Sequence, residues 1–357
     1  MERTLELLID DIAFGGKGVG RAVGKAVFVP FTIEGERVAA RVVREKKSFA
    51  EAELIEVLAA SPERTAPRCP YFGRCGGCSY QHMGYEHQLH WKARQVEQAL
   101  RRIGRFRAPP LRPIIPSPQP YEYRNRITIH VENGIVGFFR HDVHRLIDVE
   151  NCPIAEPAVN SELAALRNRH PRDGHYTLRT QRGPRVFSQT NDAVANHLAD
   201  SMAALIPPHQ SLLIDAYCGA GFFTKHHLPK FSKVVGLDWD VHAIAAAQNG
   251  ATAAETYIAG EIAIHLRAQL ESCNPGLTTV IVDPPATGLS AEVREILRVY
   301  PVATLLYVSC NPPTLARDLA DLLPAYTLQS VTPFDMFPQT AEIEVLAHLT
   351  PETQAGR

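Results

Sequence analysis

The segment Ser211-Leu212-Leu213-Ile214-Asp215-Ala216-Tyr217-Cys218-Gly219-Ala220-Gly221 decides the fold of the C-terminal half of this chain. Its first six residues are typical of a buried strand, and its glycines let the backbone turn tightly and approach a ligand. Strand and helix patterns then alternate along the chain, over residues 233–237, 242–248, 277–282, 291–298, 304–308 and 314–323. This alternation predicts a doubly wound, largely parallel α/β domain, in which ligands bind at the carboxyl ends of the strands.

The glycine loop indicates which kind of cofactor this domain holds. A dinucleotide site would have a third glycine three residues after Gly221, to seat a pyrophosphate at a helix N-terminus, but Thr224 stands there. The next strand ends in Asp238, where a carboxylate can accept hydrogen bonds from both ribose hydroxyl groups. An acidic residue before the loop and another after the second strand are typical of S-adenosylmethionine sites. We favour a methyl donor over a dinucleotide, with an ordinary strand–loop–helix turn as a further alternative.

The strand over 277–282 leads into Asp283-Pro284-Pro285-Ala286. This segment resembles the Asp-Pro-Pro segment that places a carboxylate over the reacting methyl group in nucleobase methyltransferases. Amino-directed enzymes of that kind have an aromatic residue directly after the second proline, which stacks on the base. Because Ala286 cannot stack, attack by an exocyclic adenine nitrogen is disfavoured.

Cys310 follows the strand over 304–308 and precedes a predicted helix. Because helix N-termini stabilise thiolates, this position suits a nucleophile, although isolated cysteines often serve only core packing. The last predicted strand, 341–347, alternates so that Glu342 and Glu344 share one face. Carboxylates on a strand usually face solvent, but Glu344 lies between apolar residues and is a candidate half-buried base.

A cysteine cluster lies in the N-terminal half, where Cys69, Cys75 and Cys78 have the spacing C-x5-C-x2-C. Three cysteines so close together seldom arise for packing, and Cys152, followed by Pro153, completes a candidate set of four thiolates. Structural zinc sites more often show paired C-x2-C knuckles, whereas an iron–sulfur cluster tolerates this spacing with a remote fourth ligand. We favour an iron–sulfur cluster, and zinc is the alternative.

Composition sets the class of protein. The chain has 357 residues, 45% hydrophobic and 21% charged, which excludes a small disulfide-stapled fold and a disordered chain. Lys+Arg and Asp+Glu number 18 and 13 in residues 1–107, 11 and 10 in 108–210, and 8 and 15 in 211–357. The basic front suits a polyanion, although chance surface composition explains these counts equally well. No apolar run reaches the roughly 18 residues of a membrane span, and no secretory signal is visible, so we expect a cytoplasmic protein without a membrane partner.

The first 60 residues predict a small β-barrel. Strand-like runs cover 5–9, 26–29, 37–43 and 52–57, and glycines separate them. About five short strands in this length are typical of the OB type, which commonly binds nucleic acid, though any small barrel would fit.

Taken together, these residues resemble one family over nearly the whole chain, the RNA uracil-5 methyltransferases that use S-adenosylmethionine. The stretch 13–30 resembles the TRAM domain, an OB-like RNA-binding module, and 68–82 resembles the family's iron–sulfur segment. Residues 187–191 are similar to its cofactor-contacting segment. Ser309-Cys310-Asn311-Pro312 is similar to its nucleophile motif, and 333–340, leading to Glu344, to its base motif.

The resemblance implies three domains and two cofactors. A TRAM domain would cover 1–60, a small α+β iron–sulfur domain 61–80 and 113–187, and a Rossmann-like methyltransferase domain 81–112 and 188–357. The cofactors would be S-adenosylmethionine and a [4Fe-4S] cluster. The implied cluster ligands are Cys69, Cys75, Cys78 and Cys152, and the implied S-adenosylmethionine contacts are Gln189, Tyr217, Gly219, Gly221, Phe222, Asp238 and Asp283.

The implied reaction forms 5-methyluridine, with Cys310 adding to C6 of uracil and Glu344 removing the proton from C5. The implied partner of this monomer is structured RNA, 23S ribosomal RNA before transfer RNA. Three residues depart from the family pattern: Phe222 replaces a common asparagine, Ala286 a frequent arginine and Glu342 a frequent histidine. These departures motivate an alternative, a non-catalytic RNA-binding or RNA-folding protein on the same scaffold.

Overall fold

The computed structural model describes residues 3–180 and 189–352. The chain divides into two units, each assembled from separate stretches. Unit 1 consists of Met1–Gln95, Ser117–Arg182 and Phe337–Glu342, and unit 2 of Val96–Pro116, Gly183–Met336 and Ile343–Arg357. The first boundary falls within helix α1 (Tyr85–Arg102), so one helix contributes residues to both units. The division of the chain into three domains stays a prediction.

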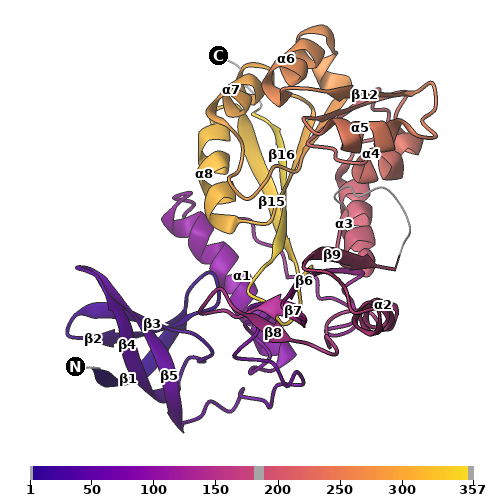
Figure 1. Cartoon of the computed structure of the whole chain (residues 1–357). Helices are drawn as coiled ribbons and strands as arrows, with labels where there is room; N and C mark the ends of the chain where they lie inside the picture. Colours follow the sequence, from indigo (N-terminus) through magenta and orange to yellow (C-terminus); the bar gives the residue numbers. More distant parts are fainter. Residues whose placement is uncertain (1–2, 181–188, 353–357) are drawn as a thin grey trace. The chain divides into compact units, whose positions relative to one another are not determined.

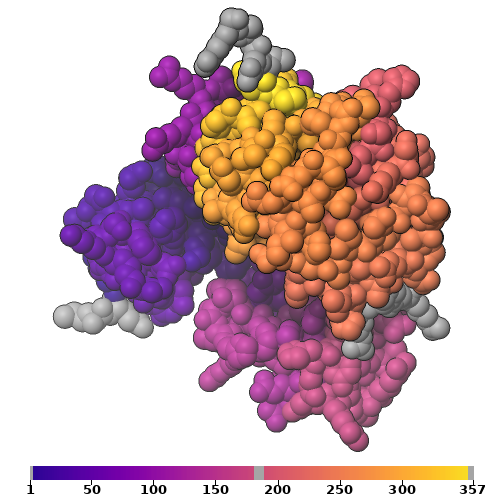
Figure 2. Space-filling view, turned by 90° about the horizontal axis from the view of Figure 1, so that it is seen from above, coloured from indigo at the N-terminus to yellow at the C-terminus, as the bar shows by residue number. Residues whose placement is uncertain are grey.

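The N-terminal part of unit 1 is a closed five-stranded barrel with the strand order β1-β2-β3-β5-β4 (Figure 1). Its strands are β1 (Thr4–Ile12), β2 (Gly18–Ala22), β3 (Lys25–Val29), β4 (Arg37–Glu45) and β5 (Phe49–Ala59). Alternate residues point inward, and Ile9, Val29 and Val38 are fully buried in the barrel core. In the space-filling view the indigo barrel residues form a rounded body (Figure 2). The small barrel predicted from the first 60 residues is confirmed.

The second part of unit 1 is an antiparallel sheet covered by a helix. The sheet has the order β8-β7-β6-β9. Its elements are β6 (Arg126–Glu132), β7 (Ile135–Phe139), β8 (Leu146–Asp148), β9 (Gly174–Arg179) and helix α2 (Pro157–Asn168). Val159 and Leu163 of α2 pack with Ile127 and Ile129 of β6 in one apolar core. Gly137 allows β7 and β8 to pair closely, because a Cβ atom there would lie 1.8 Å from the carbonyl oxygen of Ile147.

Unit 2 contains a seven-stranded sheet with the order β12-β11-β10-β13-β14-β16-β15 (Figure 1). Its strands are β10 (Leu212–Ala216), β11 (Lys233–Asp238), β12 (Glu255–Ala259), β13 (Thr278–Val282), β14 (Thr304–Ser309), β15 (Tyr326–Phe334) and β16 (Glu344–Pro351). Strands β10 to β14 are mutually parallel, whereas β16 runs antiparallel to both of its neighbours. Every residue of β13 and β14 is buried, as expected of strands covered on both faces.

Helices cover both faces of this sheet. They are α3 (Asp192–Leu205), α4 (Phe222–His227), α5 (Val241–Gln248), α6 (Ile262–Ser272), α7 (Ala291–Val299) and α8 (Pro312–Leu322), with the short 3-10 turns η1 (Leu228–Lys230) and η2 (Pro275–Leu277). Helices α6, α7 and α8 lie on one face, and α3, α4 and α5 on the other (Figure 1). The doubly wound α/β fold predicted from the sequence is therefore confirmed. Within the described ranges, no helix combines the length and the apolar composition that crossing a membrane requires.

Candidate active site

The order of the strands reverses between β10 and β13, and ligands of doubly wound sheets bind in the crevice at such a point. Ala216, the last residue of β10, pairs with Leu237 of β11 and with Val282 of β13. The loops that follow these three strands therefore leave the sheet side by side. The backbone N–H of Asp283 donates to the carbonyl oxygen of Ala216 (3.3 Å), which joins the loop after β13 to the start of the glycine loop.

The glycine loop after β10 has a tight backbone. Tyr217, Gly219 and Gly221 have φ angles of +67°, +54° and +82°, in the left-handed region that favours glycine. Tyr217 is not a glycine, and such strained residues cluster at functional sites. At Gly221 a Cβ atom would also lie 3.0 Å from the hydroxyl of Tyr257. The loop therefore keeps its backbone, rather than side chains, next to the crevice.

Asp238 ends β11 and is 7% exposed. Its Oδ2 accepts a hydrogen bond from the backbone N–H of Gly219 (2.8 Å), and its Oδ1 accepts one from the backbone N–H of Asp240 (2.9 Å). A carboxylate offers about four acceptor positions, so about two remain for the hydroxyl groups of a ligand. These bonds attach the candidate ribose carboxylate to the glycine loop.

Carboxyl groups make this edge of the sheet acidic. Burial raises the pKa of Asp215 to about 7, and the charge of Asp238 adds to this rise. The hydroxyl (2.6 Å) and the backbone N–H (3.0 Å) of Thr224 donate hydrogen bonds to Asp215 Oδ2 and oppose the rise. Burial also raises the pKa of Asp283, and the charge of Asp215 adds to that shift. Burial disfavours the charged forms of these carboxyl groups, so a cation beside them would restore their ionisation, whereas a pyrophosphate would not. The sulfonium of a methyl donor would suit such a setting.

Two other predicted cofactor contacts lie near the amino ends of helices. Gln189 is buried and lies two residues before Asn191, whose side chain caps α3 and donates to the carbonyl oxygen of Met336 (3.4 Å). Phe222 is the first residue of α4 and is 38% exposed. Residues 187–188, which the family resemblance joins to Gln189, lie outside the described residues.

Cys310 and Glu344 lie at the same end of two neighbouring strands. Cys310 directly follows β14, whose last residue, Ser309, pairs with Val345 of β16. Glu344 is the residue before Val345 and the first residue of β16. Each of the two residues is therefore one step beyond the last pair of this antiparallel ladder. Glu344 is 4% exposed and Cys310 partly exposed, whereas Glu342 precedes the strand and is exposed.

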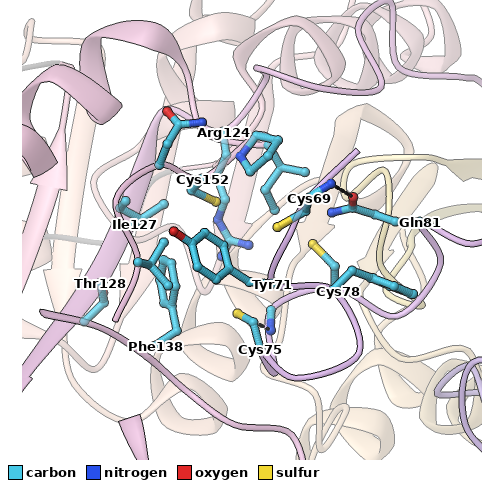
Figure 3. Close-up of a pocket in the computed structure, with 16 residues that line it drawn as sticks. Cys69, Tyr71, Cys75, Cys78, Gln81, Arg124, Ile127, Thr128, Phe138 and Cys152 are labelled. Atoms are coloured by element: carbon cyan, nitrogen blue, oxygen red, sulfur yellow. Dashed lines mark hydrogen bonds between the residues drawn. The ribbon is translucent and has the colours of Figure 1, made fainter. Parts of the chain in front are cut away.

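Unit 1 holds the four cysteines of the predicted cluster. Cys69, Cys75, Cys78 and Cys152 line one cavity of about 230 Å³, and their sulfur atoms point into it (Figure 3). Burial raises the pKa of the Cys78 thiol to about 12 and that of the Cys152 thiol to about 11, and neighbouring thiols of the set add to both shifts. A bound group that makes these four thiols ionise must therefore bring positive charge into the cavity.

Gln81 reaches the same cavity and is 2% exposed (Figure 3). Its Oε1 accepts a hydrogen bond from the backbone N–H of Cys69 (2.9 Å), and its side chain also acts on the Cys78 thiol, where a hydrogen bond from Gln81 opposes the rise in pKa. Gln81 therefore links two of the four cysteines, whose thiols form a donor set that a metal group could use. Across residues 3–180 and 189–352, no three His, Cys, Asp or Glu side chains are arranged to hold a single metal ion.

Gln81 lies within the segment 68–82, but the sequence alone gives it no role in the site. Its position three residues after Cys78 carries no signal of its own, because the hydrogen bond to Cys69 forms only when the chain folds back on itself.

Family models match two parts of the chain. Residues 266–351 match the model described as tRNA (Uracil-5-)-methyltransferase, and residues 2–55 match the TRAM domain. The chain is 30% identical to an uncharacterized RNA methyltransferase of Aquifex aeolicus, over 98% of this chain and 99% of that protein. It is 31% identical to an uncharacterized RNA methyltransferase of Bdellovibrio bacteriovorus, over 97% and 94%.

Two similar proteins have more specific names. The tRNA (uracil(54)-C(5))-methyltransferase of Schizosaccharomyces pombe is 29% identical, over 98% of this chain and 78% of its own length. The solved structure of a Pyrococcus abyssi tRNA (uracil-54, C5)-methyltransferase, in complex with S-adenosyl-L-homocysteine, has the same fold, with a TM-score of 0.75 and 22% identity over 97% of this chain and 100% of that one.

The doubly wound sheet is the fold of a methyltransferase, and the two RNA methyltransferases that match nearly the whole chain show that this chain belongs to that class. More particularly, the chain belongs to the RNA uracil-5 methyltransferase family and carries an N-terminal TRAM domain. It is an enzyme, and its substrate is RNA. The predictions of a methyl donor, an RNA partner and a TRAM barrel are confirmed.

The raised pKa of Asp215 makes the stability of unit 2 depend on pH. Between pH 3.8, the ordinary pKa of an aspartate, and about pH 7, the folded state binds a proton that the unfolded state releases. Raising the pH through this window therefore destabilises the fold, by up to about 1.4 kcal/mol per pH unit for this group. We expect Asp215→Asn to lose this contribution, so that its unfolding midpoint falls less than that of the unmodified protein between pH 5 and pH 7.

Thermal unfolding followed by circular dichroism at both pH values measures the difference. Glu261→Gln, a change at an exposed carboxylate without a capping bond, is the matched control and should keep the original pH dependence. An Asp215→Asn protein with an unchanged pH dependence would contradict the assignment.

Proposed function

We propose that this enzyme methylates C5 of a uridine through a covalent adduct, with Cys310 as the nucleophile and Glu344 as the base. The observation that carries the proposal is the β14–β16 register, which pairs Ser309 with Val345; continued by one step, it would align Cys310 with Glu344. The amino end of α8 begins two residues after Cys310, and the amino end of a helix favours negative charge. A thiolate and a buried carboxyl group at one edge of the sheet suit addition followed by elimination.

The chemistry requires both groups because C5 of uracil is a weak nucleophile. In the proposed route, the thiolate of Cys310 forms a bond to C6, and the electron pair released makes C5 an enolate carbon. C5 would then form a bond to the methyl group of the bound sulfonium donor while the bond between that methyl group and the donor's sulfur breaks, and the neutral thioether leaves. Glu344 then accepts the proton from C5, the C5–C6 double bond re-forms, and the bond between sulfur and C6 breaks. Methylated uracil and free thiolate result.

The residues proposed to hold the donor surround the crevice at the switch point. Asp238 would accept hydrogen bonds from the ribose, through the acceptor positions that Gly219 and Asp240 leave open. Asp283 and Gln189 would contact the donor and the uracil edge. The glycine loop would approach the donor with its backbone, through Tyr217, Gly219, Gly221 and Phe222.

Release of tritium from RNA containing [5-³H]uridine tests the two roles. We expect no release from Cys310→Ala, because C5 is not activated without the thiol. For Glu344→Gln we expect release to slow by about 10²–10⁴-fold, the usual contribution of a general base, and a methylated RNA–protein adduct to accumulate on a denaturing gel.

Cys273→Ala is the matched control, because Cys273 lies between α6 and η2, outside both cysteine sites. It should release tritium at the original rate. Full activity of Cys310→Ala would contradict the adduct mechanism. If the unmodified protein released no tritium from any structured RNA tried, the non-catalytic RNA-binding alternative would be favoured.

We further propose that Cys69, Cys75, Cys78 and Cys152 hold a [4Fe-4S] cluster. The support is the shared cavity, into which all four sulfur atoms point, and the Gln81 side chain at its wall. A cluster would supply the positive iron that these thiols, whose pKa values burial raises, need in order to ionise. The four cysteines would hold the cluster, and Gln81 would orient the Cys69 backbone beside it.

Iron content and visible absorption of anaerobically prepared protein test the cluster. We expect about four iron atoms per chain and absorption near 400 nm. Cys78→Ser should lose both, because a serine hydroxyl does not replace a thiolate ligand, while Cys273→Ser should keep them. Stoichiometric zinc without iron would establish the alternative metal instead.

For the substrate, we propose a uridine in a loop of large-subunit (23S) ribosomal RNA. A TRAM barrel combined with the cysteine set supports this choice, and a loop suits it because the target base leaves its stack there at the lowest cost. Transfer RNA is the second candidate, favoured by the named activity of the Schizosaccharomyces pombe relative.

Mass spectrometry of purified RNA from cells with and without the gene separates the two substrates. We expect one or more 5-methyluridines to disappear from large-subunit ribosomal RNA while transfer RNA is unchanged. Purified enzyme with S-adenosylmethionine should restore the modification in vitro. Loss confined to transfer RNA would replace the first candidate by the second.

A further inference from the structure

A single buried carboxylate joins the loop that carries Asp283, a proposed donor contact, to the strand and helix next to Cys310, the proposed nucleophile. Asp318 lies on α8 and has no exposed surface. Its Oδ2 accepts hydrogen bonds from the backbone N–H of Leu289 (2.8 Å) and the hydroxyl of Tyr307 (2.7 Å). Its Oδ1 accepts from Arg294 Nη1 (3.1 Å) and Arg317 Nε (2.8 Å). All four donors converge on one side chain in the interior.

These donors come from different parts of unit 2. Leu289 ends the loop that starts at Asp283, Tyr307 lies on β14 three residues before Cys310, and Arg294 lies on α7. The Asp318 carboxylate therefore links the loop after β13 to β14, which precedes Cys310, and to α8, which follows it. In the proposed function, that loop carries a donor contact.

Further bonds attach the same loop to α8. The Thr314 hydroxyl donates to the carbonyl oxygen of Ala286 (3.1 Å), and Arg317 Nη2 donates to that of Thr287 (3.0 Å). Gly288 has φ +76°, and a Cβ atom there would lie 2.4 Å from Asp318 Oδ2. The loop thus packs against Asp318 so closely that only glycine fits at this position.

Cys310 and Glu344 are placed differently. Their alignment comes from backbone pairing between β14 and β16, which uses no side chain of α8. The loop from Asp283 to Leu289 is not a strand or a helix, and its attachment to α8 runs through Asp318, Arg317 and Thr314. Loss of the Asp318 charge should therefore disturb the donor side of the site more than the nucleophile side.

We propose that Asp318 is a positioning residue for methyl transfer, which holds the loop carrying Asp283 in place relative to Cys310. The inference rests on the roles proposed above for these two residues. Its carboxylate is also the counter-charge of two guanidinium groups, and an asparagine would leave Arg294 and Arg317 close together without it. The loop would then lose its fixed distance from the thiol, and misplacement of a bound group by about 1 Å can slow a reaction by about 10²-fold.

The rates of two partial reactions, tritium exchange and methyl transfer, distinguish a positioning role of Asp318 from a general loss of structure. Without a methyl donor, the bond between Cys310 sulfur and C6 still forms, and C5 takes a proton from water. Reversal removes tritium from C5 and breaks the bond to sulfur, so exchange of [5-³H]uridine reports on nucleophile and base alone. Single-turnover methyl transfer at saturating donor reports on the alignment of both sides.

For Asp318→Asn we expect methyl transfer to slow at least tenfold while tritium exchange stays within twofold of the unmodified enzyme. The matched control is Asp321→Asn, one turn further along α8, which removes an exposed carboxylate from the same Arg294 (2.7 Å) and does not touch the loop. It should leave both rates within twofold. Equal losses of exchange and transfer in Asp318→Asn, or no loss in either, would overturn the proposal.

Tyr307→Phe keeps the inference testable if Asp318→Asn does not fold. It removes one hydrogen bond to Asp318 Oδ2 and leaves the charge, so we expect the same selective loss of methyl transfer, by a smaller factor. Two unchanged rates in a folded Tyr307→Phe protein would then count against positioning. Failure of the proposed function gives another result, because Cys310→Ala would then keep both tritium exchange and methyl transfer, whatever the rates of Asp318→Asn.

Discussion

The antiparallel pairing of β14 with β16 is the constraint on which the proposed site depends. In a wholly parallel sheet, the end of one strand and the start of another lie at opposite edges. Because β16 enters the sheet in the reverse direction, its first residue, Glu344, lies at the same edge as Cys310, which follows the end of β14. The proposed nucleophile and base, separated by 33 intervening residues, thereby lie at the same end of two neighbouring strands.

The other strands bring the donor side to that same edge. Parallel pairing aligns the ends of β10, β11 and β13, so that the glycine loop, Asp238 and Asp283 leave the sheet together. Burial raises the pKa values of Asp215 and Asp283, neighbouring carboxylates add to both shifts, and a bound cation would oppose them. A cationic sulfonium donor would therefore suit this end of the sheet. Asp318 attaches the loop after β13 to the helix that follows Cys310.

In unit 1, the cysteines proposed as cluster ligands lie far apart in the sequence and are brought together by the fold. Cys152 joins the loop of Cys69, Cys75 and Cys78 only because the antiparallel sheet and α2 bring it to the same cavity. Burial raises the pKa of each of the four thiols, so their protein surroundings alone favour the uncharged thiol forms. Binding of a metal cluster there would contribute to folding as well as to any chemistry.

The sequence by itself determined the fold class, because alternating strand and helix patterns and the glycine loop at 217–221 depend on local periodicity and turn chemistry. It also indicated Cys310, Asp238 and the cysteine set, through motifs that are contiguous or nearly so. It placed Glu342 and Glu344 on one strand face, whereas β16 begins only at Glu344 and leaves Glu342 exposed. Tertiary structure alone decided where β16 begins and in which direction it runs. It also decided the contact of Gln81 with the cysteines and the convergence of four donors on Asp318. Each of these features depends on pairing or contact between segments distant in the chain, which no local pattern encodes.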